Sequence, residues 1–287
     1  MSKHVKVIEC PRDAMQGIKD FIPTEKKVQY IQSLLRVGFD TIDFGSFVSP
    51  KAIPQMVDTA KVLEQLDLSK TESKLLAIIA NTRGAQDASV HQQIDYLGYP
   101  FSISENFQMR NTHKTIAQSV VTLNEILEIA DKTDKEVVVY ISMGFGNPYG
   151  DPWSVEIVGE WTERLNNMGV KILSLSDTIG SSNPENISYL FSNLIPKYPE
   201  IEFGAHLHTT PTTWFEKVDA AYNAGCTRFD GAIQGFGGCP MAKDELTGNM
   251  PTEKLLSYFT QKKVSNLNAL SFESAYNEAT KIFSAYH

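Results

Sequence analysis

The chain has 287 residues, a formal net charge of −8 at pH 7 and a sequence pI near 5.3. This acidic balance argues against a general binder of nucleic acid or of anionic membrane surfaces, so we expect neither partner. No apolar run is long enough to span a bilayer, and the first residues lack the apolar segment of a signal peptide.

The predicted elements alternate between short apolar runs and longer amphipathic runs. Thr24 is the expected N-cap of the first helix, and Gly38 its stop signal. Gly98 and Pro100 interrupt the fourth strand, which is therefore the least regular. In chain order, the first half predicts strands over 5–9, 40–44, 73–79 and 96–103 and helices over 24–37, 54–65, 83–93 and 115–133.

The second half of the chain repeats this alternation. Strands are predicted over 136–142, 171–176, 202–208 and 227–233, and helices over 154–168, 184–197 and 213–224, with two more after 252 and near 272. Eight strands, each followed by a helix, predict an α/β fold and favour a closed (β/α)8 TIM barrel over an open sheet. We expect one catalytic domain over 1–287, with about 251–287 as a helical cap or tail.

The three cysteines are odd in number and form no disulfide framework, which is typical of a reduced, cytoplasmic protein. We interpret Cys10 and Cys226 as small buried packing residues. Cys239 lies in the stretch GFGGCPMAKDELTGN, where neighbouring glycines give the backbone freedom. It is either another packing residue or a thiol that a loop carries over the barrel mouth. Metal ligation by Cys239 is the weakest alternative, since no second cysteine lies nearby.

Polar side chains gather where the predicted strands end. In a barrel of this type the chemistry lies at the carboxyl ends of the strands. These residues are Arg12, Asp13 and Gln16 after the first strand, Asp43 and Ser46 after the second, Asp177 after the sixth, His206 and His208 after the seventh, and Cys239 and Asn249 after the eighth. Their coincidence at one rim predicts an active site there.

His206 and His208 are two residues apart on a predicted strand, so their side chains point the same way. Barrel closure brings Asp13 and a residue after the last strand beside them. Imidazoles with carboxylate and amide oxygens suit a divalent ion such as Mg²⁺ or Mn²⁺. The alternative is that the histidines only satisfy hydrogen bonds in the core; their position at this rim favours the metal site.

Arg12 is suited to stabilise an enolate or to bind a carboxylate, and the alternative is an ordinary ion pair at the rim. Asp43 and Asp177 have the same two kinds of interpretation. Each is either a ligand-orienting or proton-relaying group or a simple partner of Arg12.

The residues so far resemble those of the 3-hydroxy-3-methylglutaryl-CoA lyases, within the wider group of metal-dependent barrel lyases and synthases. The resemblance covers nearly the whole chain. It is carried by PRDAMQ (11–16), SFVSPKAIPQM (46–56), SLSDTIG (174–180), HLH (206–208) and GFGGCPMA followed by GN. The condensing synthases share the Arg-Asp and HxH elements, and the glycine-flanked cysteine followed by proline resembles the lyase branch.

The resemblance implies roles for individual residues. It implies a divalent metal ion, Mg²⁺ or Mn²⁺, as the cofactor. The implied metal ligands are Asp13, His206, His208 and Asn249; the implied catalytic residues are Arg12, Cys239, Asp177, His206 and Asp43; and the implied substrate contacts are Arg12, Gln16, Lys19 and Ser46.

The implied reaction is a retro-Claisen cleavage of 3-hydroxy-3-methylglutaryl-CoA to acetyl-CoA and acetoacetate, of the kind used in leucine catabolism, by a homodimer. His206 or Asp177 would accept the proton of the substrate 3-hydroxyl, Arg12 would stabilise the enolate, and Cys239 or a water would protonate it. The alternative is a metal-dependent aldolase or Claisen-type synthase that acts on a 2-oxo acid or on another 3-hydroxyacyl-CoA. A catalytically silent barrel that binds a partner is the alternative from another class.

The chain departs from the family pattern at three places. Asp43 stands where the family usually has glutamate, and Thr209 stands where it usually has aspartate. Pro211 and Thr212 follow in place of the usual Tyr-Gly, and the loop from Cys239 to Asn249 is one residue longer. These departures leave the expected metal ligands intact and bear on the identity of the substrate.

Overall fold

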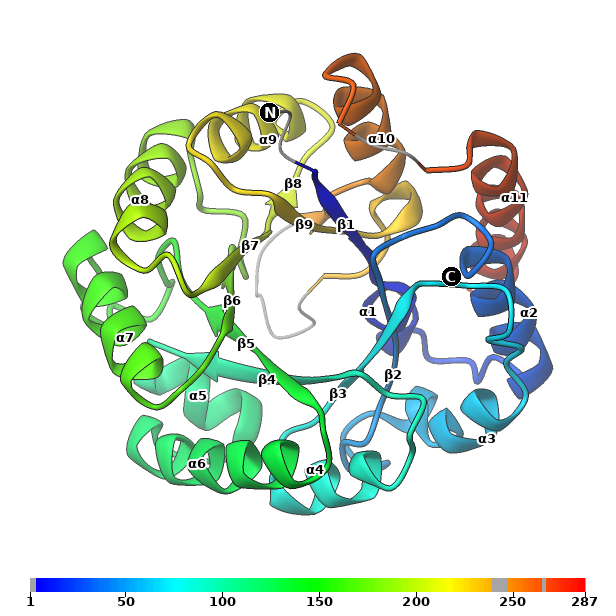
Figure 1. The fold of residues 1–287 in the computed structure, drawn as a ribbon, viewed down its shortest axis with the longest axis horizontal. Helices are drawn as coiled ribbons and strands as arrows, with labels where there is room; N and C mark the ends of the chain where they lie inside the picture. The colour runs from blue at the N-terminus through cyan, green and yellow to red at the C-terminus, as the bar shows by residue number, and fades with distance from the viewer. Residues whose placement is uncertain (1–3, 239–246, 265–266, 287) are drawn as a thin grey trace.

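The fold is described from a computed structural model, in which residues 4–238, 247–264 and 267–286 are described. The barrel strands are β1 (Lys6–Glu9), β2 (Thr41–Ser46), β3 (Lys74–Ile78), β4 (Tyr96–Ser102), β5 (Glu136–Ser142), β6 (Ile172–Ser176), β7 (Glu202–His206) and β9 (Arg228–Gly231). They form a closed barrel in this order, and every neighbouring pair is parallel (Figure 1). The predicted TIM barrel is confirmed.

Helices form a ring outside the strands (Figure 1). They are α1 (Pro11–Gln16), α2 (Thr24–Leu34), α3 (Thr59–Glu64), α4 (Thr82–Ser89), α5 (Glu105–Thr112), α6 (Ile116–Lys132), α7 (Val155–Asn167), α8 (Pro184–Lys197), α9 (Trp214–Asn223), α10 (Thr252–Gln261) and α11 (Ala269–Tyr286). In the ring α10 lies beside α9, and α11 packs against α2, where the rings of Tyr30 and Phe283 meet edge to face 6.1 Å apart. The expected C-terminal helices are therefore present.

Several local predictions were wrong. Pro23 is the N-cap of α2, and Thr24 is its first helical residue, whose hydroxyl donates 2.7 Å to Asp58. The helix expected over 54–65 is split into a 3₁₀ turn, Pro54–Met56, and the shorter α3. Two further helices, α1 and α5, lie within stretches expected to be loops. All of these differences fall at the rim, where tertiary contacts override local signals.

The carboxyl end of the barrel carries one addition to the plain fold. The strand expected over 202–208 ends at His206, and His208 begins a separate strand, β8 (His208–Thr209). This strand pairs antiparallel with β10 (Gly248–Asn249), and His208 lies opposite Asn249. A segment forty residues further along the chain is thereby tied to the end of β7.

The interior of the barrel is apolar along β3 to β6. This interior cluster consists of Leu76, Ile78, Tyr96, Val138, Tyr140 and Ile172, and it is separate from the larger core between strands and helices. Gly98 on β4 faces the same cluster. The side chains of Leu76, Ile78 and Tyr140 fill the space beside this glycine, so a residue with a Cβ does not fit there.

Replacing Gly98 by alanine is expected to destabilise the protein by about 1–3 kcal/mol. A Cβ there would lie 2.5 Å from Cδ1 of Ile78 and 2.9 Å from Cδ2 of Leu76. Urea denaturation measures the change. Gly159→Ala in α7 is the matched control, because a Cβ at Gly159 meets nothing within 4 Å and alanine favours the helix. Equal stabilities of the two variants would contradict the prediction.

Candidate active site

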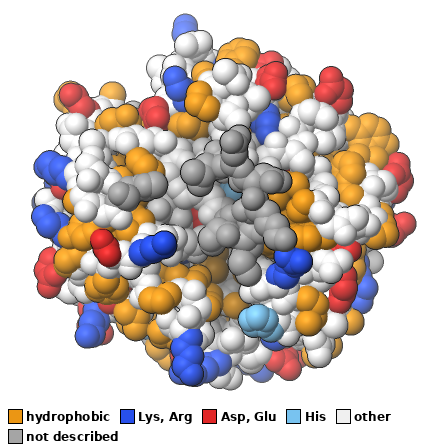
Figure 2. Space-filling view, turned by 180° about the vertical axis from the view of Figure 1, so that it is seen from behind, with side chains coloured by type: hydrophobic (Ala, Val, Ile, Leu, Met, Phe, Trp, Pro, Cys, Tyr) orange, Lys and Arg blue, Asp and Glu red, His pale blue; other side chains and the backbone are white. Residues whose placement is uncertain are grey.

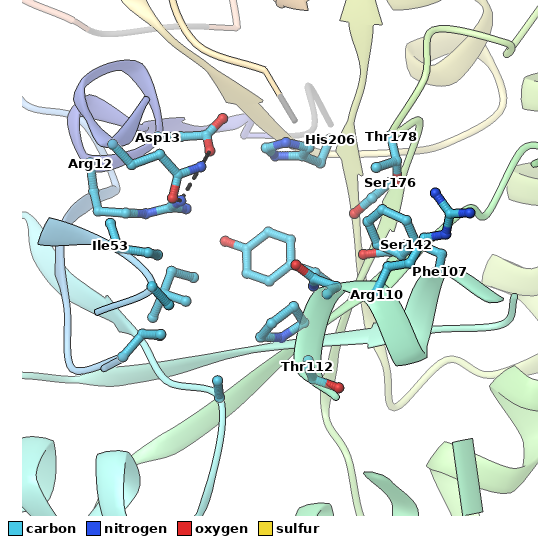
Figure 3. Close-up of a pocket in the computed structure, with 18 of the residues that line it drawn as sticks. Arg12, Asp13, Ile53, Phe107, Arg110, Thr112, Ser142, Ser176, Thr178 and His206 are labelled. Atoms are coloured by element: carbon cyan, nitrogen blue, oxygen red, sulfur yellow. Dashed lines mark hydrogen bonds and ion pairs between the residues drawn. The ribbon is translucent and has the colours of Figure 1, made fainter. Parts of the chain in front are cut away.

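A cavity of about 450 Å³ opens at the carboxyl ends of the barrel strands. Figure 3 shows Arg12 and Asp13 on one side of it, His206 across from them, and Ser142, Ser176 and Thr178 on a further wall. Helix α5 contributes Phe107, Arg110 and Thr112 to the mouth. The cavity therefore joins a polar end, near the first and seventh strands, to an apolar wall formed by Val48, Ala52, Ile53, Ile78, Ala80 and Pro100.

Arg12 lies in the short helix α1, which starts at Pro11 directly after β1. Its Nε donates to both carboxylate oxygens of Asp43 at 3.1 Å, and Nη2 also donates to Asp43. Its Nη1 donates 3.0 Å to Asp13 and 2.9 Å to Gln16. The guanidinium is therefore held in one orientation. Arg12 lines the cavity wall and is only 8% exposed.

Asp13, His206 and His208 form a group suited to a divalent cation. One donor atom of each lies within 4.8 Å of the others. The imidazole rings are 5.5 Å apart between centroids, and all three side chains line the cavity. The predicted convergence of Asp13 with the two histidines is thus present, although the histidines belong to two different strands.

Asn249 reaches this group through β10. Its Nδ2 donates 2.6 Å to Oδ2 of Asp13 and 2.9 Å to the carbonyl of Phe236. Both amide hydrogens are used within the protein, so the carbonyl oxygen is the atom that a metal would take. A carboxylate, two imidazoles and an amide oxygen fit Mg²⁺ or Mn²⁺ by their chemistry.

The electrostatics of the group agree with cation binding. Burial opposes the ionisation of Asp13, but Arg12 and the histidines outweigh it and lower its pKa. Burial and the neighbouring His206 lower the pKa of His208 to about 4, so this ring is neutral at pH 7 and able to ligate. A second group, formed by Cys10, His206 and Asp230, is a poorer candidate because burial raises the pKa of the Cys10 thiol well above its ordinary value.

Asp43 has a different environment from Asp13. Burial raises its pKa to about 6 although Arg12 opposes this shift. It is 1% exposed and does not line the cavity, and three hydrogen bonds join it to Arg12. Of the interpretations open at the outset, the geometry favours pairing with Arg12.

Besides Asp43, three more expected site residues do not line the cavity. Asp177 is buried behind it, where it binds Nζ of Lys217 at 2.8 Å and the backbone N–H of Ser182 at 3.0 Å. The Ser46 hydroxyl donates 3.2 Å to the carbonyl of Ile78, and Lys19 is exposed. Cys239 lies outside the described residues, so its proposed role stays a prediction.

Other residues at the site were missed from the sequence. Asp230 on β9 contacts His206, and Tyr140 on β5 meets the same ring edge to face, 5.7 Å between centroids. The regular inward alternation of β9 is the signal that would have found Asp230. Thr209, the departure beside the histidines, is buried, and its hydroxyl has no hydrogen-bond partner among the described residues.

Cys10 and Cys226 are buried free thiols, as expected of packing residues. Arg110 is exposed and lines the cavity mouth, with its guanidinium 4.7 Å above the Tyr149 ring. In the face shown in Figure 2, blue basic side chains are scattered among red acidic ones. No described helix is long and apolar enough to cross a membrane.

Glu9 at the end of β1 anchors the segment that carries Asn249. Its carboxylate accepts a hydrogen bond from the N–H of Ile233 at 3.0 Å and another from the hydroxyl of Thr252. These partners lie on either side of the segment along the chain. Burial raises the pKa of Glu9 to about 8.

Glu9 is therefore expected to make stability depend on pH. The folded state retains the proton to about pH 8, whereas an unfolded glutamate loses it near pH 4. The contribution of Glu9 to the free energy of unfolding is fully present below its unfolded pKa. It is lost as the pH rises through its folded pKa, and the loss is a few kcal/mol. Urea denaturation between about pH 5 and pH 9 should show a smaller decline for Glu9→Gln than for the wild type. Parallel declines would contradict this.

Comparison with known proteins gives consistent matches. A family model described as HMGL-like matches residues 6–277. The hydroxymethylglutaryl-CoA lyase YngG of Bacillus subtilis is 32% identical over 254 residues, which are 88% of this chain and 84% of that protein. The mitochondrial hydroxymethylglutaryl-CoA lyase of Bos taurus is 32% identical over 256 residues, 88% and 78% of the two chains.

Solved structures give the same result. An HMG-CoA lyase from Acinetobacter baumannii, in complex with coenzyme A and 3-methylmalate, has a TM-score of 0.91 at 29% identity. The match covers 99% of this chain and 92% of the Acinetobacter chain. The HMG-CoA lyase of Bacillus subtilis also has a TM-score of 0.91, at 31% identity, with 98% and 94% covered.

Proposed function

The chain belongs to the HMGL-like family, and we propose that it is a lyase that cleaves 3-hydroxy-3-methylglutaryl-CoA into acetoacetate and acetyl-CoA. The observation that carries this proposal is the arrangement of Asp13, His206 and His208 beside a fixed Arg12 at one end of the cavity. The family relationship supplies the substrate class, and these side chains supply the chemistry.

The proposed metal ligands are Asp13, His206, His208 and Asn249, with Mg²⁺ or Mn²⁺ as the ion. When bound, such an ion supplies Lewis acidity that lowers the pKa of the substrate hydroxyl. The residues themselves bring a carboxylate and two imidazoles together, and the amide of Asn249 donates to Asp13. His208 provides a neutral ring, and Asp13 provides a carboxylate whose pKa is lowered by its neighbours although burial opposes this.

The proposed reaction breaks the bond between C2 and C3 of the substrate. The 3-hydroxyl loses its proton, the C2–C3 bond breaks, and C3 becomes the ketone carbon of acetoacetate. The bonding electrons pass to C2 and give the acetyl-CoA enolate, which then takes one proton at carbon. Arg12 is proposed to donate to the developing enolate oxygen, because its guanidinium is fixed at the cavity wall before substrate binds.

The structure narrows the choice of proton acceptor. Asp177 is occupied by Lys217 and Ser182 and does not line the cavity. His206 lines the cavity, but its Nδ1 contacts Asp230, which leaves Nε2. One nitrogen cannot bind a cation and accept a proton at once, so we assign His206 to the metal and propose that a water in the cavity accepts the proton of the 3-hydroxyl.

The remaining assignments are proposals from the sequence and the site together. Gln16 lines the cavity and is proposed to contact the substrate, while Asp43 is proposed to orient Arg12. Lys19 and Ser46 reach the substrate only if their surroundings change on binding. A homodimer in the cytoplasm remains our expectation, and the free thiols Cys10 and Cys226 agree with a reducing compartment.

The purified protein is expected to release acetoacetate from 3-hydroxy-3-methylglutaryl-CoA in the presence of Mg²⁺ or Mn²⁺. Cys239→Ser is expected to reduce turnover sharply, since the thiol is the proposed acid for the enolate carbon. Cys226→Ser is the matched control, because that thiol is buried away from the cavity. Acetoacetate is measured by a coupled reductase assay.

Two results would count against this proposal. Absence of acetoacetate under both metals and with fresh reductant would overturn the lyase assignment. Normal turnover of Cys239→Ser would instead contradict the role of this thiol as the acid, while absence of acetoacetate would direct the search to an aldolase or Claisen-type synthase through condensation assays with 2-oxo acids.

A further inference from the structure

The barrel interior has a polar column between β7 and β9. Phe229 belongs to the outer core between strands and helices, so its neighbours Arg228 and Asp230 point into the barrel. Arg228 lies opposite Gly204 of β7, two residues before His206. Arg228 is 0% exposed and Asp230 is 2% exposed. A buried cation and a buried anion therefore lie on the same strand, beneath the group formed by Asp13, His206 and His208.

Asp230 contacts the imidazole of His206 directly. Its Oδ2 lies 3.0 Å from Nδ1, and the hydroxyl of Ser174 on β6 donates to the same oxygen at 3.5 Å. A carboxylate accepts hydrogen bonds and cannot donate them when ionised, so Nδ1 carries the hydrogen. The lone pair of the neutral ring then lies on Nε2, the nitrogen left for the cavity.

Arg228 lies on the same face of β9 as Asp230, and no ion pair within 4.0 Å joins the two described side chains. Its Nη1 donates 3.0 Å to Glu202, while its Nε and Nη2, and Oδ1 of Asp230, have no hydrogen-bond partner among the described residues. Burial lowers the pKa of the guanidinium, but the charge of Asp230 is the first of the attractions that outweigh burial and raise it. A buried cation needs compensating anions. Glu202 at 3.0 Å and Asp40 at 3.9 Å pair with Arg228 directly, and Asp230 adds its charge from within the column.

Gly204 makes this placement sterically feasible. A Cβ at Gly204 would lie 3.2 Å from Cδ of Arg228 and 3.2 Å from Oγ of Ser174. Any larger residue would push the arginine stem or the serine that contacts Asp230. The column thus consists of Glu202, Arg228, Asp230 and His206, in order toward the cavity.

We propose that Asp230 is the positioning residue of His206 and that the buried charge of Arg228, on the same face of β9, supports Asp230 electrostatically. This inference rests on the proposed function, because His206 is a proposed metal ligand. Asp230 fixes the tautomer and the ring orientation, so that Nε2 faces the cavity already prepared for the cation. Arg228 acts only through Asp230.

The first test needs no variant. NMR of the metal-free wild type with ¹⁵N-labelled histidine, at about pH 9 where imidazoles are neutral, reports which nitrogen of each ring carries hydrogen. His206→Asn identifies the signal of His206 by its loss. The expected result is hydrogen on Nδ1 of His206. Hydrogen on Nε2 would overturn the proposal.

The second test measures Mn²⁺ affinity by the loss of the free-ion EPR signal. Asp230→Asn is expected to weaken Mn²⁺ binding about 10–100-fold, because the amide can also donate to Nδ1 and so move the ring hydrogen to Nε2. Arg228→Met is expected to weaken it in the same direction by less. The double variant should bind no more weakly than Asp230→Asn, because the two residues act in series.

Asp58→Asn is the matched control. Asp58 is a buried carboxylate whose Oδ1 lies 2.6 Å from Nζ of Lys27, and neither residue lines the cavity. It is expected to lose stability and to keep wild-type Mn²⁺ affinity, so general destabilisation can be separated from positioning. Wild-type affinity in Asp230→Asn would overturn the inference while the metal site stands. Absence of Mn²⁺ binding in the wild type would instead overturn the metal assignment in the proposed function.

Discussion

Arg12→Lys is expected to lower kcat about 10²–10³-fold, the usual effect of removing one fixed donor to a developing oxyanion. Arg12 uses Nε, Nη1 and Nη2 to bind Asp43, Asp13 and Gln16 at once. A lysine keeps the positive charge but has no planar fork, so it cannot keep these contacts and hold one orientation. The loss should appear in kcat more than in KM, because the enolate forms only after binding.

The assay follows acetoacetate release over a range of substrate concentrations, with Mn²⁺ affinity measured on the same preparations. Arg83→Lys is the matched control, because Arg83 is solvent-exposed on α4 and away from the active-site cavity. A kcat within about threefold of the wild type would contradict the role of Arg12. A parallel loss of Mn²⁺ binding would mean that the change acts through Asp13 instead.

Removal of divalent ions is expected to reduce turnover to background, and addition of Mg²⁺ or Mn²⁺ is expected to restore it. Without the ion, the carboxylate of Asp13 and the rings of His206 and His208 have no Lewis acid with which to lower the hydroxyl pKa. Thermal unfolding adds a second measurement, since an ion that binds only the folded state stabilises it by about 2.7 kcal/mol at a concentration one hundred times its Kd.

Dialysis against EDTA followed by metal analysis tests this directly. EDTA already saturated with Mg²⁺ is the control for effects of the chelator itself. Full activity at less than about one-tenth of an equivalent of metal would contradict the proposed cofactor. An unchanged melting temperature on metal addition, with activity restored, would place the ion on the substrate rather than at the protein site.

Much of the fold was predictable from local pattern. The apolar runs that became β1 to β7 and β9 correspond to all eight predicted strands, because buried parallel strands need continuous apolar residues. The split of the second predicted helix was not predictable. There, Gln55 binds the backbone of Ile18, Asp20 and Ile22, so contacts with a distant segment decide where helix α3 begins.

The candidate site shows the same division. Chain position alone placed Asp13, His206, His208 and Asn249 at one rim, since every strand of a parallel barrel ends on the same side. It could not distinguish Asp43 from Asp177, which are both acidic residues near strand ends. The first is bound to Arg12 and the second to Lys217, and only three-dimensional packing selects those partners.

By itself, therefore, the sequence determined the barrel, the rim and the family, because these depend on periodicity and on short motifs. Tertiary structure alone decided that His208 pairs with Asn249 across β8 and β10, and that Asp230 and Arg228 stand beneath His206 inside the barrel. The physical reason is that a motif records neighbours along the chain. Hydrogen bonds and buried charges in this site join residues up to 236 positions apart, and closure of the barrel brings them together.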